Sequence, residues 1–251
     1  MTEPPLRSRQ ALRTLLIQIR DNPAVRVEEH NSFCQFSGLR HDQVDIFNVF
    51  DKPLFDPHII EGYHGVFVGG ASEASVMEPD RFPFVNSSIE LMRFCISRRV
   101  PVFASCFGFQ LAVLALNGEI VRDTRGFEMG TLPISLSEAA KQDPLFHDTP
   151  DPFMAVSVHR ERAVKTPEGC TELARTALCS HSFKVNESPF WAFQFHPEVD
   201  KRVLVERLTV FKAAYTDGDD HLESVLRQAV ETPESNQLLA KFVDRVLLGS
   251  H

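Results

Sequence analysis

The chain has 251 residues, 43% of them hydrophobic, and carries 34 acidic side chains against 26 basic ones. This length suits one well-buried core, and the acidic balance disfavours nucleic acid or an anionic membrane as the main partner. The first residues lack the apolar core of a signal peptide, and no later apolar run is long enough to span a bilayer, so we expect a cytoplasmic protein. The five cysteines show no paired metal-ligand spacing, so we expect reduced thiols, no metal and no other cofactor.

Apolar runs alternate with helix-like stretches through the first half of the chain. Strands are predicted at residues 12–18 and 41–50, from Gly65, and from Val100, and helices at 23–39, 83–99 and 107–116. Asn117 and Gly118 have the residue types that end a helix. Such alternation predicts parallel strands with right-handed crossovers, in which ligands bind at the carboxyl ends of the strands.

The second half of the chain has a different hydrophobic pattern. Short alternating runs at 119–123, 127–135 and 152–158 suggest a small antiparallel elaboration, and further strands are predicted at 173–178, 182–185 and 190–195. A helix at 201–215 should cover the sheet, and the polar break at 216–220 separates it from tail helices at 221–230 and 236–248. We predict a single α/β domain over residues 1–251, with a core at about 12–214 and a helical extension at about 219–248. That extension packs on the domain, closes over the site or contacts a partner.

One stretch combines a strand, a cysteine and the start of a helix. The apolar run from Val100 leads into Cys106, and helix-like residues follow Gly108. A nucleophile on such a turn stands in front of the sheet, with a helix N-terminus behind it and backbone N–H groups able to meet an anion. Ala104 and Gly108 are small enough for the close approach of strand and helix. The alternative is a buried cysteine that packs as a small hydrophobic residue.

A second stretch supplies a base for this cysteine. The apolar strand that begins at Trp191 runs directly into His196, Pro197 and Glu198. Proline prevents a helix and fixes a turn, so the carboxylate can fold back and orient the imidazole. An imidazolium and a helix N-terminus both favour the thiolate, which is the reactive form of cysteine. The sequence therefore predicts a catalytic triad of Cys106, His196 and Glu198.

These two motifs resemble those of the class I, or triad, glutamine amidotransferases. The elbow of that family usually reads Gly-x-Cys-x-Gly-x-Gln, and here the segments are Ala104-Ser-Cys106-Phe-Gly108-Phe-Gln110 and Phe193-Gln-Phe-His196-Pro-Glu198. The match in order and spacing runs from about residue 12 to about residue 214. Within this family, the sequence most resembles the stand-alone relatives of the glutaminase domain of GMP synthase. The resemblance implies a flavodoxin-like fold, with a mostly parallel central sheet flanked by helices.

The resemblance also implies an oxyanion hole and a substrate cradle. The former would consist of backbone N–H groups of Gly70 and Phe107, and the latter of Gly69, Gln110, Val158 and His159. Without the elbow, the two adjacent glycines would suggest a plain turn. In the substrate segment, Val158 replaces the serine and Arg160 the glycine that many relatives carry, which leaves room for a γ-glutamyl compound larger than glutamine.

The implied reaction is hydrolysis of the glutamine side-chain amide through a γ-glutamyl thioester. It releases glutamate and ammonia, and because the sequence shows no synthase domain, either a separate synthase subunit receives the ammonia or no such partner exists. One alternative is a γ-glutamyl peptidase or hydrolase that acts on a γ-glutamyl conjugate. Another is a non-catalytic relative that binds a partner or metabolite, although such a protein has no need of Cys106, His196 and Glu198 together.

Overall fold

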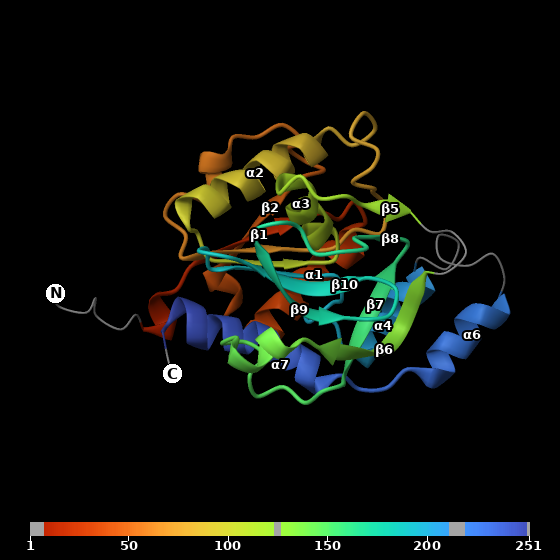
Figure 1. The fold of residues 1–251 in the computed structure, drawn as a ribbon. Helices are drawn as coiled ribbons and strands as arrows, with labels where there is room; N and C mark the ends of the chain where they lie inside the picture. Colours follow the sequence, from red (N-terminus) through yellow and green to blue (C-terminus); the bar gives the residue numbers. More distant parts are fainter. Residues whose placement is uncertain (1–7, 123–126, 211–218, 250–251) are drawn as a thin grey trace.

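The computed structural model of the protein describes residues 8–122, 127–210 and 219–249 (Figure 1). Its described strands are β1 (Thr14–Gln18), β2 (Val44–Asn48), β3 (Gly65–Val68), β4 (Val102–Ser105), β5 (Val121–Arg122), β6 (Glu128–Leu136), β7 (Phe153–His159), β8 (Glu161–Arg162), β9 (Cys170–Arg175), β10 (Ser180–Val185) and β11 (Phe190–Phe193). Within the described residues, nine of them form one sheet of order β2-β1-β3-β4-β11-β10-β9-β6-β7, and β5 pairs with β8 beside it.

The strands predicted in the first half of the chain form the parallel half of the sheet. β2, β1, β3, β4 and β11 are parallel neighbours. Every residue of β1, β3, β4 and β11 is buried, as expected for strands covered on both faces. Side chains alternate between faces, so Val66 and Val68 join one core cluster while Phe67 joins the other. The predicted parallel α/β architecture is confirmed.

Helices cover both faces of this sheet (Figure 1). They are α1 (Pro23–Ser37), α2 (Phe84–Arg98), α3 (Phe107–Ala115), α4 (Lys201–Val210), α6 (Asp219–Gln228) and α7 (Pro233–Lys241). α2 and α3 pack together on one face, and α1 and α7 pack together on the other. The start of α1 is fixed because the side chain of Asn22 accepts hydrogen bonds from two backbone N–H groups and proline follows it.

The antiparallel elaboration continues the same sheet. β10, β9, β6 and β7 follow β11 and pair antiparallel with one another. β9 starts at Cys170, three residues before the predicted strand, because Cys170 pairs with Val185 of β10. Residues 41–43, predicted as the start of a strand, instead form the 3-10 turn η2 (His41–Gln43). The described residues also include three more 3-10 helices, η1 (Arg9–Ala11), η3 (Pro57–Ile60) and η4 (Glu138–Gln142), and one π-helix, η5 (Phe242–Leu247).

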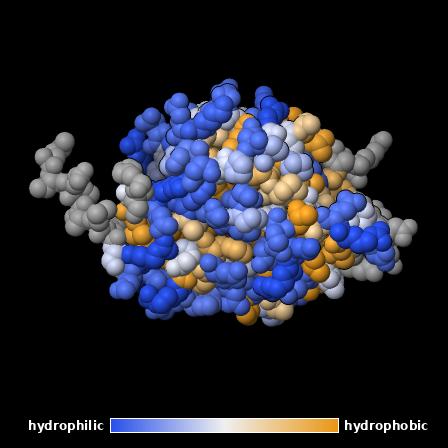
Figure 2. All heavy atoms as spheres, turned by 90° about the horizontal axis from the view of Figure 1, so that it is seen from below, coloured by the Kyte–Doolittle hydropathy of each residue, from blue (hydrophilic) through white to orange (hydrophobic). Residues whose placement is uncertain are grey.

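The tail packs against the sheet. Residues 211–218, which hold the predicted end of the 201–215 helix and part of the polar break, lie outside the described residues. α7 and η5 place Leu238, Leu239 and Phe242 in the core beside Phe67 and Phe103. The face that carries these helices is mainly hydrophilic, with apolar residues in small separate groups, because the apolar sides of the helices point inward (Figure 2). Among the described residues, no helix combines the length and apolar character needed to cross a membrane.

Candidate active site

Cys106 lies on a sharp turn between β4 and α3. Its backbone has φ 50° and ψ −96°, a region that side-chain-bearing residues rarely adopt. The turn is held because Cys106 N–H donates to the Phe193 carbonyl of β11 at 2.7 Å. A Cβ at Gly108 would lie 3.0 Å from the backbone oxygen of Val68, so the position has no room for a side chain. Ala104 is fully buried yet fits between Val68 and Ala192 in the sheet register.

His196 and Glu198 meet on the turn that follows β11. Nδ1–H of His196 donates to Glu198 Oε1 at 2.7 Å, and both side chains are buried. The backbone N–H of His196 donates to Val156 O at 2.8 Å, which anchors the turn to β7. This hydrogen bonding fixes the ring and leaves Nε2 to face Cys106.

The electrostatics of the two side chains are coupled. Burial lowers the pKa of His196, but the negative charges of Cys106 and Glu198, together with hydrogen bonds to both, outweigh burial and raise that pKa to about 9. Burial also raises the pKa of Glu198, and the adjacent imidazolium overcomes this and holds it below its usual value. The arrangement therefore favours the protonated form of His196 beside the ionised Glu198.

The glycine pair after β3 lies directly against this group. A Cβ at Gly70 would be 2.8 Å from His196 Cε1 and 3.5 Å from Cys106 Cβ, so Gly70 borders both side chains. Gly69 N–H donates to Ile17 O, and its carbonyl accepts from Gly108 N–H at 3.3 Å. Phe107 opens α3, whose first N–H groups have no partner within the helix. Gly70 and Phe107 thus border the nucleophile from two sides, while the Gly69 N–H is already used within the fold.

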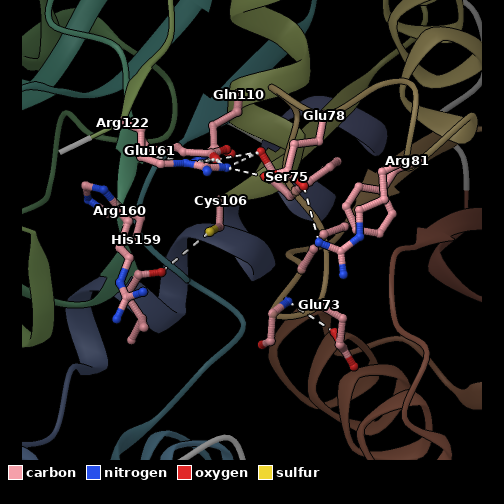
Figure 3. A pocket seen from close by; sticks show the side chains of 16 residues that line it. Glu73, Ser75, Glu78, Arg81, Cys106, Gln110, Arg122, His159, Arg160 and Glu161 are labelled. Atoms are coloured by element: carbon pink, nitrogen blue, oxygen red, sulfur yellow. Dashed lines mark hydrogen bonds and ion pairs between the residues drawn. The ribbon is translucent and has the colours of Figure 1, made fainter. Parts of the chain in front are cut away.

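A pocket of about 440 Å³ opens in front of Cys106 (Figure 3). Its wall is strongly charged, and one guanidinium organises much of it. Arg122 donates to Glu161 at 2.6 Å, to Glu78 at 2.9 Å and to Ser75 Oγ at 2.8 Å. Arg160 also lines the pocket, with its guanidinium over the ring of Phe127.

The predicted substrate residues occupy different parts of this wall. Gln110 lines the pocket, but its amide donates to the Glu161 carbonyl at 2.8 Å and so holds the wall in place. The Val158 carbonyl lies 3.9 Å from Cys106 Sγ. The side chain of His159 is 2% exposed and lies against Glu128, so a substrate contact from this residue would come from its backbone. Binding roles for these residues stay predictions.

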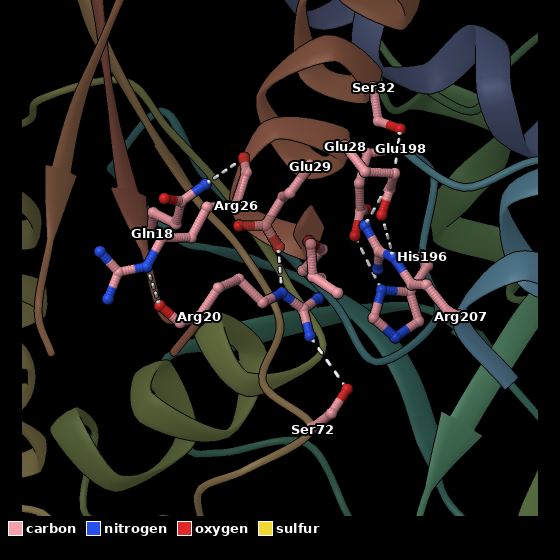
Figure 4. Close-up of polar contacts among 12 residues, drawn as sticks. Gln18, Arg20, Arg26, Glu28, Glu29, Ser32, Ser72, His196, Glu198 and Arg207 are labelled. Carbon is pink, nitrogen blue, oxygen red and sulfur yellow. Dashed lines mark hydrogen bonds and ion pairs between the residues drawn. The ribbon is translucent and has the colours of Figure 1, made fainter. Parts of the chain in front are cut away.

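Two ion pairs beside the site, one buried and one partly buried, were not predicted from the sequence (Figure 4). Arg20 pairs with Glu29 at 2.8 Å and donates to Ser72 Oγ at 3.1 Å, which ties it to the loop that carries Gly70. Arg207 of α4 pairs with Glu28 at 2.6 Å. Arg20 had a usable signal, since it follows a buried parallel strand at the edge where ligands bind.

The C-terminal extension also contacts the His-Pro-Glu turn. The Asn236 side chain donates to Pro197 O at 2.8 Å and to Val199 O at 3.0 Å. It is buried in α7, so the helix supports the backbone on both sides of Glu198. Nothing in the local sequence around Asn236 indicates this contact.

A strained cysteine, an imidazole held by a carboxylate and a glycine loop meet at the carboxyl edge of a parallel sheet. These features define an α/β protein with a triad-type site. The chain belongs to the class-I glutamine amidotransferase family, whose model matches residues 40–209.

Curated relatives carry two kinds of name. Gamma-glutamyl peptidase 3 of Arabidopsis thaliana is 25% identical over 206 residues, which cover 79% of this chain and 81% of the relative. A subunit of the glutamine-hydrolyzing GMP synthase of Methanocaldococcus jannaschii is 29% identical over 118 residues, covering 47% of this chain and 61% of that relative. A glutamine amidotransferase of Thermotoga maritima superposes with a TM-score of 0.72 at 18% identity, covering 94% of this chain and 98% of the other, which shows the shared fold.

Proposed function

We propose that the protein hydrolyses the side-chain amide of glutamine, with Cys106 as nucleophile, His196 as acid and base, and Glu198 as the group that orients the imidazole. The observation that carries this proposal is the geometry of the three side chains: Gly70 borders both Cys106 and His196, and His196 Nδ1–H donates to Glu198 Oε1 at 2.7 Å. The raised pKa of His196, about 9, suits the imidazole to carry the proton that the leaving nitrogen needs at neutral pH.

The residues suit a two-step reaction. The Cys106 thiolate attacks the amide carbon, and the oxygen becomes negative where N–H groups of Gly70 and Phe107 can meet it. The imidazolium of His196 gives its proton to the leaving nitrogen, so ammonia departs and a γ-glutamyl thioester forms. The neutral imidazole then takes a proton from water, hydroxide adds to the thioester, and glutamate leaves as Cys106 regains its thiolate.

A γ-glutamyl conjugate is the second candidate substrate. The pocket of about 440 Å³ is within the range of about 300–1,000 Å³ usual for small-molecule sites and extends well beyond Cys106 to Arg81 and Glu78. Gamma-glutamyl peptidases are among the relatives that align over most of the chain. With such a substrate the leaving group would be an amino acid or peptide amine instead of ammonia.

Transfer of the ammonia to a separate synthase subunit is part of the first proposal. Its support is the similarity to the Methanocaldococcus jannaschii protein, which is named as one of the subunits of a GMP synthase and so implies another. Cytoplasmic location stays a prediction from the sequence.

The test measures glutamate release from glutamine and from γ-glutamyl dipeptides, with and without candidate synthase subunits. Cys106→Ala should abolish release, and Cys170→Ala, which changes a cysteine of β9 away from the pocket, should not. Intact-mass detection of a γ-glutamyl adduct on Cys106 would identify the thioester. Equal activity of the Cys106→Ala variant would refute the mechanism, and turnover of dipeptides alone would select the second candidate. A folded wild-type chain with no turnover of any of these compounds would favour a binding role.

A further inference from the structure

Four side chains able to bind a metal ion converge behind the pocket wall. Glu128 begins β6, His159 ends β7, Cys179 directly precedes β10, and His181 lies within β10. Glu128 and His159 are register partners, and the β9–β10 hairpin supplies the other two. All four residues are buried, and their possible ligand atoms lie within 4.8 Å of one another.

The spacing of these atoms is close to that of a tetrahedral metal site. Glu128 Oε2 lies 2.7 Å from His181 Nε2, 3.0 Å from His159 Nε2 and 3.6 Å from Cys179 Sγ. Zinc bond lengths of about 2.0–2.3 Å place neighbouring ligand atoms about 3.3–3.6 Å apart, so the tightest contact needs to open by about 0.6 Å. Two imidazoles, one thiolate and one carboxylate are all ligands that Zn²⁺ accepts.

His159 provides an independent observation. It is 6% exposed, and neither of its ring nitrogens makes a hydrogen bond with any residue in the described part of the chain. Nε2 approaches Glu128 to 3.0 Å without the alignment of an N–H···O bond. Buried polar atoms of native proteins nearly always have a partner. A nitrogen lone pair directed at an ion between the imidazole and the carboxylate would account for this geometry.

We propose that Glu128, His159, Cys179 and His181 bind one Zn²⁺ ion. Binding releases the thiol proton of Cys179, and the charges of thiolate, carboxylate and Zn²⁺ then cancel, which suits a buried position. Four protein ligands close the coordination sphere, so the ion is structural and takes no part in amide hydrolysis.

The proposed ion would fix the substrate side of the pocket. It joins β6, β7 and the β9–β10 hairpin, and its ligand His159 follows Val158, whose carbonyl faces Cys106. Glu128 also borders a second, open pocket of about 350 Å³, lined by residues 176–178 as well, which provides a path for the ion. The sequence suggested no metal because the ligands come from three separate segments and lack a paired motif.

The experiment uses the full chain, freed of metal with a chelator, incubated with ZnSO₄ and passed through gel filtration. Elemental analysis gives the zinc content, melting gives Tm with and without zinc, and Co²⁺ reports a thiolate ligand through its charge-transfer absorption. Cys179→Ser and Glu128→Gln each remove one ligand. Cys170→Ser changes a partly exposed cysteine in the same hairpin, and Cys106→Ala removes the thiol in the other pocket.

We expect one zinc per wild-type chain, a higher Tm with zinc, and a cobalt–thiolate band. Cys170→Ser and Cys106→Ala should keep the zinc, the higher Tm and the cobalt band. Loss of a hydrogen-bond partner of a metal ligand typically lowers metal affinity by roughly 10–100-fold. Cys179→Ser and Glu128→Gln, which each remove a ligand itself, should lower the zinc affinity by at least as much. Wild-type protein without stoichiometric zinc would overturn the proposal and leave Glu128 as the shared partner of His159 and His181. Zinc lost from Cys106→Ala but kept by Cys179→Ser would place the ion at the nucleophile and overturn it equally. The zinc content of the wild-type chain tests the proposal even if a ligand variant fails to fold.

Discussion

Gly70→Ala tests the contact between the glycine loop and the triad. Gly70 has no positive φ, so alanine suits its backbone, but the added Cβ would lie 2.8 Å from His196 Cε1. Ordinary contacts begin near 3.4 Å, so the imidazole must move by about 0.6 Å relative to the loop. Because a displacement of about 1 Å can cost a hundredfold in rate, we expect kcat/KM to fall by about 10–100-fold. This equals about 1.4–2.7 kcal/mol of transition-state stabilisation.

The assay is glutamate release over a range of substrate concentrations, with Tm measured on the same samples. Gly62→Ala is the matched control, because its Cβ meets nothing within 4 Å although the backbone has φ +86°. The control should lower Tm through backbone strain and leave kcat/KM unchanged. Gly70→Ala should lower kcat/KM and leave Tm unchanged. Wild-type kcat/KM in a folded Gly70→Ala variant would refute the inference that this loop borders the reacting groups.

The remaining predictions concern the acid, its orienting carboxylate and two packing contacts. Since the imidazolium form of His196 delivers the proton, kcat/KM should fall as pH rises through about 9, and a profile flat to pH 10.5 would contradict this role. Glu198→Gln should lower kcat by about 10²–10⁴-fold at unchanged Tm, measured by steady-state kinetics. Asn236→Ala leaves two buried carbonyls without their donor, so urea titration should show a loss of about 1–3 kcal/mol. Gly108→Ala overpacks against Val68 and should cost about 1–3 kcal/mol in the same titration.

The elbow and the His-Pro-Glu turn could be predicted because each is a local pattern. Cys106 and His196 both follow apolar strands, and the carboxyl ends of parallel strands lie at one edge of a sheet. The sequence does not state that β4 and β11 are neighbours, since most of the antiparallel extension separates them along the chain. Their pairing, with Ser105 opposite Phe193, is what brings the two motifs together.

The supports of the site could not be predicted, because they depend on contacts between segments distant in sequence. Arg20 and Glu29 contact one another across β1 and α1, and Asn236 reaches the His-Pro-Glu turn from the tail. The metal-ligand cluster likewise requires the register of β6 with β7, which places Glu128 opposite His159. Alternating apolar patterns give strands but leave their pairing open.

The layout separates the proposed chemistry from the selection of substrate. Cys106, His196 and Glu198 lie on buried segments of the parallel half; Asn236 holds the His-Pro-Glu turn, and Arg20 holds the adjoining glycine loop through Ser72. The outer wall is built differently, from loops, the end of β7 and the short strands β5 and β8, and it includes the ion pair between the partly exposed Arg122 and the buried Glu161. Under the proposed function, substitutions in that wall would change which γ-glutamyl compound fits without moving Cys106, His196 or Glu198. Relatives of this chain are named both as γ-glutamyl peptidases and as a GMP synthase subunit, as expected where differences in function arise at the site and not in the scaffold.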